Sequence, residues 1–391
     1  MKKCKLSEIS TILNGYAFKS TKYVDNGIRI IRIANVQDGE IVDENPCFYP
    51  YETTDNIDKY KLFEGDLLIS LTGNVGRVGV LPKSMMPAAL NQRVCCLRIN
   101  KVKVNLKYLF YYLRQYNFIQ DCIKASKGVA QLNLSTKWLA EYEILLPELS
   151  EQQRIVERIE ELFSQLDSAV ETLQKTKQQL AVYRQAVLKE AFECCTQKIS
   201  VESVCEHVTD GDHMPPPKSV NGIPFIMISN IKNNVIDFSN TAFVGRDYYE
   251  KINNKRRPRK GDVLYTVTGS FGIPIVVDYD KEFCFQRHIA LLRPKKIITQ
   301  RYLYYVLQTP YVYSQATSCA TGTAQKTVGL NVLRKMRIPF IDSIEEQEKI
   351  ITELESKISM CENIEKTVDT ALQQAEAMRQ SILKKAFEGK L

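Results

Sequence analysis

The sequence predicts an α+β protein with two similar mixed α/β domains, separated by a long antiparallel two-helix coiled coil and related by a pseudo-two-fold internal repeat. Three observations predict this fold class. Motifs recur in the same order about 195 residues apart, short apolar runs are punctuated by Gly, Asn and Asp, and two long segments contain neither Pro nor Gly. A repeat of this length indicates a duplicated domain pair, because the units of solenoid repeats span only tens of residues.

Six motifs carry the repeat in each half of the 391-residue chain. The motifs of the first half and their partners are Gly65–Leu68 and Gly261–Leu264, Thr72-Gly73 and Thr268-Gly269, Gly76 and Gly272, Gln92-Arg93 and Gln286-Arg287, Gly128–Gln131 and Gly322–Gln325, and Arg184–Glu193 and Arg379–Glu388. The offset drifts only between 194 and 196 residues, so few net insertions separate the halves. A chain of this length can hold two domains, each with its own core.

Each half divides into a mixed segment and a long helical segment. We place the boundaries of the four segments at residues 1–147, 148–196, 197–341 and 342–391. Apolar runs predict strands at 28–36, 67–71 and 94–99 in the first mixed domain and at 223–231, 263–267 and 289–292 in the second.

One helix recurs inside the mixed domains, at 106–119 behind Asn105 and at 300–314 behind Thr299. Asn and Thr favour the position before a helix, because their side chains accept hydrogen bonds from its first N–H groups. In the first copy, Tyr108, Leu109, Tyr112 and Tyr116 share one stripe. Such a stripe is more typical of packing against a core than of base stacking.

Apolar or small residues follow each other at steps of four and three from Ile155 to Val187 and from Ile350 to Ile382. This spacing predicts a coiled coil of helices on the order of 60 Å long. Lys357 breaks the second seam, although Ile358 beside it can partly cover the gap. The helices bracket the second mixed domain, so an internal pair is antiparallel. A homo-oligomeric coiled coil is the alternative, which the matched length and register of the two runs do not favour.

The starts of both long helices carry capping signals. Ser150 is the predicted N-cap of the first, with Gln153 three residues later, and Ser343 is the predicted N-cap of the second, with Glu346 in the reciprocal position.

The formal net charge of +8 comes from 53 Lys and Arg against 45 Asp and Glu, which permits a polyanionic partner without demanding one. The eleven Cys form no CxxC motif, so we expect reduced thiols in a cytoplasmic protein. His207 and His213 near Cys205 suggest zinc, but the Pro215–Pro217 run favours a loop and we expect no metal site. No apolar run reaches the roughly 18 residues of a membrane span, so no membrane partner is expected.

The sequence contains no recognisable catalytic residues. The nearest match to the Asn-Pro-Pro-Phe tetrapeptide of adenine methyltransferases is Asn45–Phe48, which we interpret as a turn. A GxxxxGK[ST] phosphate loop and a nuclease-like carboxylate cluster are both missing. The Ser in Gly269–Gly272 has no counterpart in Gly73–Gly76, so it is a poor candidate nucleophile.

The repeated glycines instead predict contact loops whose neighbouring side chains differ between the halves. The candidate DNA-contacting residues on these loops are Asn74, Arg77, Lys127 and Gln131 in the first half and Ser270 and Lys326 in the second, with Phe271 and Thr323 as further differing neighbours. Loops with the same repeated glycines but different polar side chains would suit two modules that recognise two different DNA sequences.

Two further groups are candidate DNA contacts. Gln92, Arg93, Gln286 and Arg287 carry the side chains that read adenine and guanine, although a structural hydrogen bond or salt bridge is an equally good interpretation. The basic run Lys255, Arg256, Arg257, Arg259 and Lys260 adjoins the repeated Gly261-Asp262. Phosphate contact is preferred there over a solvated loop.

With these motifs in duplicate and in order, the chain resembles the specificity (S) subunit of type I restriction–modification systems. The features that carry the resemblance are Glu151–Val156 and Glu346–Ile351 at the helix starts, Lys189–Glu193 and Lys384–Gly389 at the helix ends, and Gly65–Leu68 and Gly261–Leu264 before Thr-Gly loops.

The resemblance implies a non-catalytic protein whose domains 1–147 and 197–341 each recognise one half of a split double-stranded DNA target. Helices 148–196 and 342–391 would act as spacer and as docking surface for two methylation subunits, and restriction subunits would join the assembled complex. It also implies no cofactor in this chain, with S-adenosylmethionine, ATP and Mg2+ on the partner subunits. A stand-alone DNA-binding regulator or decoy is the alternative. The specificity half of a fused methyltransferase is a third interpretation, which the missing catalytic motifs exclude for the sequence as it stands.

Overall fold

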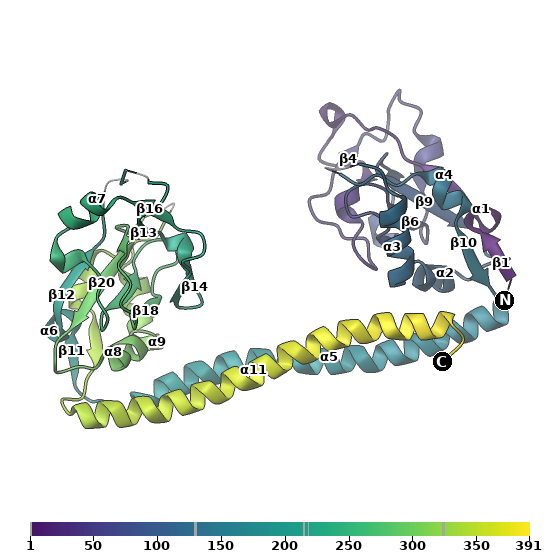
Figure 1. The fold of residues 1–391 in the computed structure, drawn as a ribbon. Coiled ribbons are helices and arrows are strands. Elements are labelled where there is room, and N and C mark those ends of the chain that lie inside the picture. Colours follow the sequence, from purple (N-terminus) through teal and green to yellow (C-terminus); the bar gives the residue numbers. More distant parts are fainter. Residues whose placement is uncertain (1, 129–130, 214–215, 218, 323–324) are drawn as a thin grey trace. The chain divides into compact units, whose positions relative to one another are not determined.

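The computed structural model describes residues 2–128, 131–213, 216–217, 219–322 and 325–391. The chain forms two compact units (Figure 1). Unit 1 contains Met1–Leu173 and Thr370–Leu391, and unit 2 contains Gln174–Asp369. Each unit therefore combines one mixed domain with one end of each long helix, which confirms the predicted fold class and shows that the helix ends are integral to the domains.

Unit 1 contains three antiparallel or mixed sheets. Its strands are β1 (Lys2–Lys5), β2 (Ser10–Asn14), β3 (Ile28–Ile31), β4 (Phe48–Tyr49), β5 (Lys61–Leu62), β6 (Leu67–Ser70), β7 (Val78–Val80), β8 (Ala88–Leu90), β9 (Val94–Ile99) and β10 (Glu143–Leu146). The strand orders are β1-β10, β2-β9-β6-β7 and β4-β3-β8-β5, with β3 and β8 parallel. The β1-β10 pair joins the two ends of the domain next to the first long helix.

Unit 2 repeats this plan with small changes. Its strands are β11 (Lys198–Ser200), β12 (Cys205–Asp210), β13 (Ile223–Ile226), β14 (Ile231–Lys232), β15 (Val235–Ile236), β16 (Ala242–Val244), β17 (Val263–Thr266), β18 (Pro274–Val276), β19 (Cys284–Phe285), β20 (Ile289–Pro294) and β21 (Arg337–Pro339). The strand orders are β11-β21, β12-β20-β17-β18, β16-β13-β19 and β14-β15. The four-stranded sheet β12-β20-β17-β18 is thus the counterpart of β2-β9-β6-β7.

The helices follow the same repeat. The short helices are α1 (Leu6–Ile9), α2 (Leu106–Tyr112), α3 (Tyr116–Ala125) and α4 (Thr136–Glu141) in unit 1, and α6 (Val201–Val204), α7 (Arg246–Lys251), α8 (Gln300–Val306), α9 (Pro310–Cys319) and α10 (Leu330–Lys335) in unit 2. The long helices are α5 (Leu149–Ala191) and α11 (Ile344–Phe387), and two 3-10 turns used below are η3 (Asp58–Tyr60) and η6 (Asn254–Arg256). No helix within the described residues is both long and apolar enough to cross a membrane.

The predicted strands at 67–71, 94–99, 263–267 and 289–292 are confirmed to within two residues as β6, β9, β17 and β20. The strands predicted at 28–36 and 223–231 are too long, because both stop before a buried Asn. The side-chain oxygen of Asn35 accepts the N–H of Arg32 over 2.9 Å, and that of Asn230 accepts the N–H of Met227 over 3.0 Å. Each bond starts a 3-10 turn and ends the strand.

The prediction of one helix at 106–119 and one at 300–314 is wrong, since each is two helices joined by a short turn. In unit 2 the break falls at Thr309, which caps α9, and at Pro310, which occupies the start of α9. The predicted caps of the preceding helices are confirmed: Asn105 accepts the N–H of Lys107, and Thr299 accepts the N–H of Tyr302.

The aromatic stripe packs as predicted over its first three residues. Tyr108 and Leu109 are buried and Tyr112 is half-buried, but Tyr116 begins α3 and is 62% exposed. Tyr108 packs edge-on against Phe387 at the end of α11, with ring centroids 5.2 Å apart. The stripe is therefore the contact between the domain and a long helix.

Unit 2 makes the same contact with the other long helix. Phe192, just after the end of α5, packs edge-on against Tyr302 with ring centroids 5.3 Å apart. The repeated Ala-Phe-Glu sequence therefore places one Phe in the core of each domain: Phe387 in unit 1 and Phe192 in unit 2.

The start of each long helix is fixed to its domain by a fully buried glutamine. The amide of Gln152 donates to the carbonyl of Pro147 over 2.8 Å, and its oxygen accepts the N–H of Asn105 over 2.8 Å. Gln347 makes the matching bonds, donating to the carbonyl of Ile341 and accepting the N–H of Thr299. These bonds explain why a Gln recurs at this position.

The predicted N-cap Ser343 is confirmed, because its hydroxyl accepts the N–H of Glu346 over 3.2 Å. The predicted N-cap Ser150 is wrong, since α5 already begins at Leu149. Gln153 does not cap the helix but bonds the side chains of Asn105 and Glu157. The buried Gln152, not a serine, holds this helix start.

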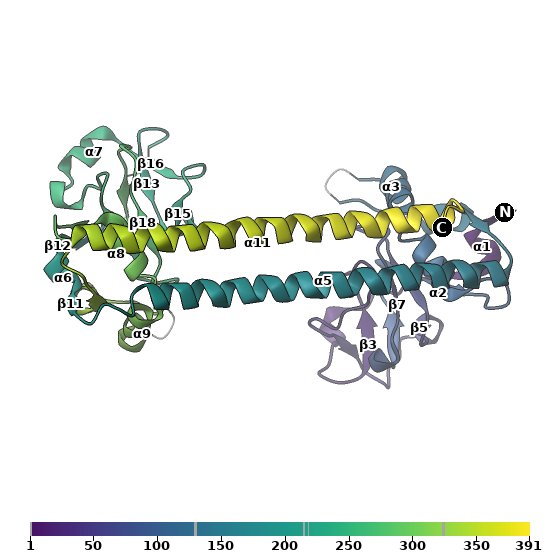
Figure 2. The ribbon, with the colours of Figure 1, turned by 90° about the horizontal axis from the view of Figure 1, so that it is seen from below.

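Within each unit α5 and α11 lie side by side and antiparallel (Figure 2), as predicted. In unit 1, Arg379 pairs with Asp167. In unit 2 the ion pairs are Lys177–Asp369, Arg184–Glu362 and Lys357–Glu190, at 2.7, 3.0 and 3.4 Å. Lys357 is thus on the surface, and Ile358 is buried in its place, 9% exposed.

Candidate nucleic-acid interface

Three loops of unit 1 meet at the end of β6, where the repeated glycines lie. They are the hairpin loop 70–77, the turn 91–93, and the glycine–glutamine loop 127–133, of which residues 129–130 are outside the described residues. The N–H of Gly73 donates to the carbonyl of Leu132 over 2.9 Å, and the N–H of Leu71 donates to the carbonyl of Arg93 over 3.0 Å. These bonds join the loops into one surface, which we call the three-loop surface.

Unit 2 builds its three-loop surface with equivalent bonds. Its loops are 266–273, 286–288 and 321–327, and residues 323–324, including the differing neighbour Thr323, are outside the described residues. The N–H of Gly269 donates to the carbonyl of Lys326 over 3.0 Å, and the N–H of Val267 donates to the carbonyl of His288 over 2.9 Å. Gly73 and Gly269 have φ values of +70° and +71°, in the left-handed region that favours glycine.

The turns 91–93 and 286–288 show which residues of the two halves are equivalent. In unit 1 the N–H of Gln92 donates to the carbonyl of Tyr16 over 3.0 Å. In unit 2 the N–H of Arg287 donates to the carbonyl of Asp212 over 2.9 Å. Gln92 and Arg287 therefore occupy the same backbone position.

The preceding residue gives the same alignment. The N–H of Asn91 donates to the carbonyl of Ile31, and the N–H of Gln286 donates to the carbonyl of Ile226. Each of these carbonyls belongs to the last residue of an equivalent strand, β3 or β13. Asn91 is therefore equivalent to Gln286.

The predicted pairing of Gln92-Arg93 with Gln286-Arg287 is therefore wrong by one residue. The repeated dipeptide suggested the pairing, but the hydrogen bonds of the turn decide it, and they place Arg93 opposite His288. The sequence carries the signal in its offsets: the Gln-Arg pair recurs after 194 residues, whereas the adjoining strands recur after 195.

The candidate residues of unit 1 gather on its three-loop surface with one exception. Asn74, Gln92, Arg93, Lys127 and Gln131 are all exposed. The side chains of Gln92 and Arg93 have no hydrogen-bond or ion-pair partner among the residues that the structure describes, so they are available to a ligand.

The exception is Arg77, which is half-buried. Its guanidinium donates to the side-chain oxygen of Gln37 over 2.8 Å. This bond ties the second arm of the hairpin loop to the segment after β3, so Arg77 contributes to the structure of the loop.

In unit 2, Ser270, Arg287 and Lys326 are exposed and Gln286 is half-buried. Within the described ranges, the side chains of Gln286 and Arg287 have no hydrogen-bond or ion-pair partner. Burial, followed by the charge of Arg287, holds the pKa of His288 below its usual value. His288 is therefore a neutral hydrogen-bonding group beside a permanent cation.

The basic run of unit 2 is divided between two places. Arg256 ends η6 and donates to Asp210 at the end of β12 over 3.3 Å, and His213 lies 2.8 Å from the other oxygen of that carboxylate. The exposed Lys255 adjoins them. Since Asp212 accepts the N–H of Arg287, this part of the run borders the three-loop surface.

The rest of the run lies at the start of β17, at the opposite end of that strand from Ser270. Arg257 packs over the ring of Tyr249, 5.0 Å from its centroid. The N–H of Arg259 donates to Asp262 over 2.8 Å, and Lys260 lies 4.0 Å from the carboxylate of Asp280. These three residues adjoin Gly261-Asp262, as the sequence requires, and lie at the other end of β17 from the hairpin loop 266–273.

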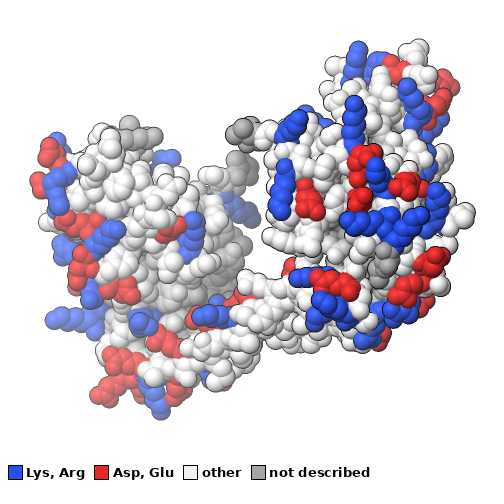
Figure 3. Space-filling view, turned by 45° about the vertical axis from the view of Figure 1, so that its right-hand side comes forward, with Lys and Arg blue, Asp and Glu red and all other residues white. Residues whose placement is uncertain are grey.

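A hollow of about 760 Å³ lies between β12 and η6 in unit 2. Its charged lining residues are Lys251, Lys255, Arg256 and Arg334 together with Glu202, Glu206 and Asp212. Figure 3 shows the same mixture more widely, with blue and red side chains interspersed over the visible surface of both units. Neither unit presents a face of one sign in this view.

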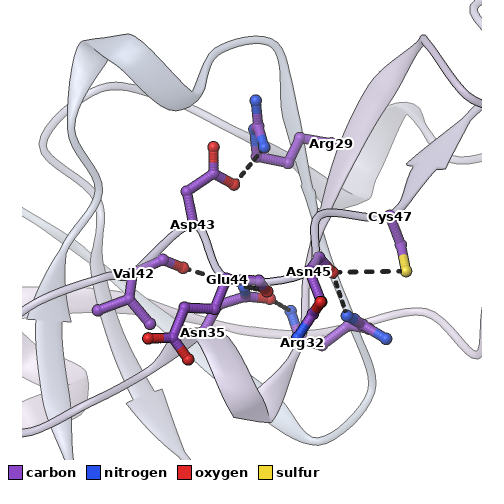
Figure 4. Close-up of polar contacts among 8 residues, drawn as sticks. All are labelled: Arg29, Arg32, Asn35, Val42, Asp43, Glu44, Asn45 and Cys47. Carbon is purple, nitrogen blue, oxygen red and sulfur yellow. Dashed lines mark hydrogen bonds and ion pairs between the residues drawn. The ribbon is translucent and has the colours of Figure 1, made fainter. Parts of the chain in front are cut away.

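Three side chains of the β3 region hold the segment 42–47 of unit 1 (Figure 4). Arg29 pairs with Asp43, Asn35 donates to the carbonyl of Val42 over 3.0 Å, and Arg32 donates to the carbonyl of Asn45 over 2.7 Å. Asn45 has a φ of +50°. The chain therefore bends at Glu44-Asn45 as predicted, but Phe48 already belongs to β4, so only the start of Asn45–Phe48 is a turn.

Sequence reasoning missed the aromatic residues beside Gln92. The rings of Tyr16 and Tyr60 lie 5.2 Å apart, and both are half-buried against the cluster around Phe18 and Tyr49. In unit 2, Asp212 is equivalent to Tyr16, because its carbonyl accepts the matching hydrogen bond of the turn. Arg256 is equivalent to Tyr60, because the two residues end the matching turns η6 and η3. The repeated glycines Gly15 and Gly211, which directly precede Tyr16 and Asp212, could have indicated these positions. At each glycine an added Cβ would meet a backbone oxygen, at 2.1 and 2.0 Å, so the chain passes close to another segment there.

The histidine and cysteine candidates form no metal-binding group in the described part of the chain. His207 lies on β12, and His213 is engaged by Asp210. All eleven cysteines are free, and burial raises the pKa of Cys95 to about 12. The eight buried thiols pack as small apolar groups, whereas Cys194 and Cys319 are exposed and Cys47 is half-buried.

The chain belongs to the family of the type I restriction modification DNA specificity domain, whose model matches residues 1–181 and 197–374. It is 27% identical to the type I restriction enzyme EcoBI specificity subunit of Escherichia coli, over 99% of this chain and 85% of the relative. It is 24% identical to the EcoKI specificity subunit of Escherichia coli K12, over 99% of this chain and 88% of the relative.

Solved structures share the fold. A chain from a structure of type I R-M complex assembly and conformational transition matches with a TM-score of 0.75 and 20% identity, over 100% of this chain and 98% of that one. The HsdS subunit of Thermoanaerobacter tengcongensis matches with a TM-score of 0.55 and 20% identity, over 100% and 97%.

Proposed function

We propose that the chain is the non-catalytic recognition subunit of a type I restriction–modification complex, with each unit reading one half of a bipartite double-stranded DNA target. One observation carries the proposal: the same backbone frame of three loops is built twice, and its exposed side chains differ. Base edges specify a sequence, whereas the frame only positions the readers. Two frames with different side chains therefore suit two different half-sites.

The relatives support this assignment over the alternatives. Both full-length relatives described above are named as specificity subunits, so the stand-alone regulator or decoy is not favoured. The same names fit a subunit that recognises DNA while other subunits carry the chemistry.

The long helices are the proposed docking surface for two methylation subunits. In unit 2, Val182, Tyr183, Met360 and Ile364 are 71, 49, 63 and 42% exposed on α5 and α11. Exposed apolar side chains grouped on a helix pair are typical of a surface that a partner covers. S-adenosylmethionine, ATP and Mg2+ would then reside on the methylation and restriction subunits.

A domain exchange tests the function. The full chain is co-expressed with a type I methylation subunit that co-purifies with it, and the methylated sites are mapped in host DNA. Replacing residues 1–147 by the matching domain of a relative should change one half of the methylated sequence and leave the other intact. The donor must keep residues that bond Gln152, because that side chain joins the domain to α5.

The reciprocal exchange of residues 197–341 is the matched control and should change only the other half. A change in both halves, or in neither, would contradict the two-module reading. Methylation by the purified chain with S-adenosylmethionine alone would contradict its non-catalytic role.

A further inference from the structure

One backbone position of the three-loop surface carries a side chain of different hydrogen-bonding chemistry in each unit. It is residue 92 in unit 1 and residue 287 in unit 2, made equivalent by the bonds to Tyr16 and Asp212. The repeated Gln-Arg dipeptide hides this, because it aligns Gln with Gln and Arg with Arg.

The backbone on both sides of this position is fixed by the frame. The preceding N–H bonds the end of β3 or β13, and the following carbonyl accepts the N–H of Leu71 or Val267 over 3.0 or 2.9 Å. Since these partners are equivalent, the two Cα atoms have the same relation to their hairpin loops. The residue placed there can differ without changing the frame.

The two side chains are exposed and uncommitted. Neither Gln92 nor Arg287 has a side-chain hydrogen bond or ion pair to any residue in the described ranges, and both are exposed. Binding a ligand would therefore break no internal bond. By contrast, Arg77 at the end of the hairpin loop is half-buried and already bonded to Gln37.

The chemistry of the two side chains selects different bases. A glutamine amide donates and accepts at once, which matches N7 and the N6 amino group of adenine in the major groove. An arginine fork donates twice, which matches O6 and N7 of guanine. Phosphate contact is the competing role for Arg287, but a neutral amide at the equivalent position has no comparable attraction to phosphate.

We propose that position 92/287 determines specificity, with Gln92 reading an adenine in one half-site and Arg287 a guanine at the corresponding place in the other. This inference rests on the proposed function and deepens it. It also predicts that exchanging the two side chains exchanges the two preferences.

The test uses the full chain with its methylation subunit and compares Gln92→Arg and Arg287→Gln with the wild type by mapping methylated sites. Gln92→Arg should change one A·T pair of one half-site to G·C, and Arg287→Gln should change one G·C pair of the other half-site to A·T. In binding assays each variant complex should bind DNA that carries the original base pair about tenfold or more weakly than DNA that carries the new one.

Gln92→Ala and Arg287→Ala are the second variants, which should relax one base pair each and leave the rest of the target unchanged. Lys101→Gln is the matched surface control, because Lys101 is exposed beyond the opposite end of β9. Co-purification with the methylation subunit checks that every variant assembles.

An unchanged target in both exchange variants would overturn the inference. So would a loss that is uniform across sequences and reduces the salt dependence of binding, because that is the behaviour of a phosphate contact. A wild-type complex that methylates no bipartite sequence would instead overturn the proposed function itself. The two failures are thus distinguishable.

Discussion

At the residue scale, one buried carboxylate fixes the strand that leads into each hairpin loop. Asp66 and Asp262, from the repeated Gly-Asp motif, each accept two bonds from an arginine, Arg98 or Arg293, of the neighbouring strand. Arg293 is 12% exposed whereas Arg98 is 33% exposed. If the carboxylate were removed, water could therefore solvate the Arg98 guanidinium of unit 1 better than the Arg293 guanidinium of unit 2.

We expect Asp262→Asn to lower the free energy of unfolding of unit 2 by about 3 kcal/mol or more, because it leaves Arg293 buried without its charge partner. Asp66→Asn should lower that of unit 1 by less. Denaturant titration followed by circular dichroism measures both, with the fluorescence of Trp138, the only tryptophan, reporting on unit 1. Asp58→Asn, which removes an exposed pair with Lys61, should change stability by less than about 1 kcal/mol.

His288 should make unit 2 less stable at acid pH. Its pKa is lowered in the folded state by burial and by Arg287, so the unfolded chain binds the proton more readily. The stabilisation is complete above the usual histidine pKa of about 6.5 and is lost as pH falls through the folded value. Between pH 7.5 and 5.5 the melting temperature of unit 2 should fall less in His288→Gln than in the wild type. An equal fall in melting temperature would contradict this role of His288.

At the element scale, the long helices are attached to the domains by few but buried groups. Gln152 and Gln347 are 0% exposed and bond the loops at which the short helices α2 and α8 begin. The phenylalanines near the opposite ends of the same helices enter the domain cores. Each domain therefore binds the start of one long helix through a buried glutamine and packs against the end of the other through a buried phenylalanine.

Gln152→Ala should destabilise unit 1 by about 3 kcal/mol, because it leaves the N–H of Asn105 and the carbonyls of Pro147 and Lys103 without this partner. The adjacent Gln153→Ala is the matched control, since its side chain is exposed, and should cost less than about 1 kcal/mol. Trp138 fluorescence in a denaturant titration measures both. Equal effects would show that the buried bonds do not hold the helix start.

At the scale of the whole molecule, α5 and α11 each run without a break through both units. Their ion pairs follow one antiparallel register in unit 1 and in unit 2. We propose that this helix pair is the spacer between the two proposed DNA-reading modules.

Inserting four residues after Gln174, with a matching insertion after Leu372 to keep the register, should lengthen the pair by about 6 Å. Four residues add slightly more than one full helical turn, so the second module keeps nearly its original rotation about the helix axis. We expect the gap in the methylated target to grow by about one or two base pairs, at about 3.4 Å each, with both half-sites unchanged. Altered half-sites with a constant gap would exclude the helices as the spacer.

The sequence predicted the duplicated α+β architecture, the helix caps Asn105, Thr299 and Ser343, and the paired helices. Of the six strands that it placed, four are confirmed. These features follow from periodicity and from local hydrogen bonding, which neighbouring residues encode. The candidate residues Asn74, Gln131, Ser270 and Lys326 also belong to the loops that meet, because repeated glycines mark those loops.

What only the tertiary structure decided depends on bonds between residues far apart in the chain. Arg77 is held by Gln37, and the basic run is divided between two ends of a sheet. The equivalence of Gln92 with Arg287 was decided in the same way. A repeated dipeptide records side-chain identity alone, whereas the carbonyls of Tyr16 and Asp212 fix where each residue lies in space.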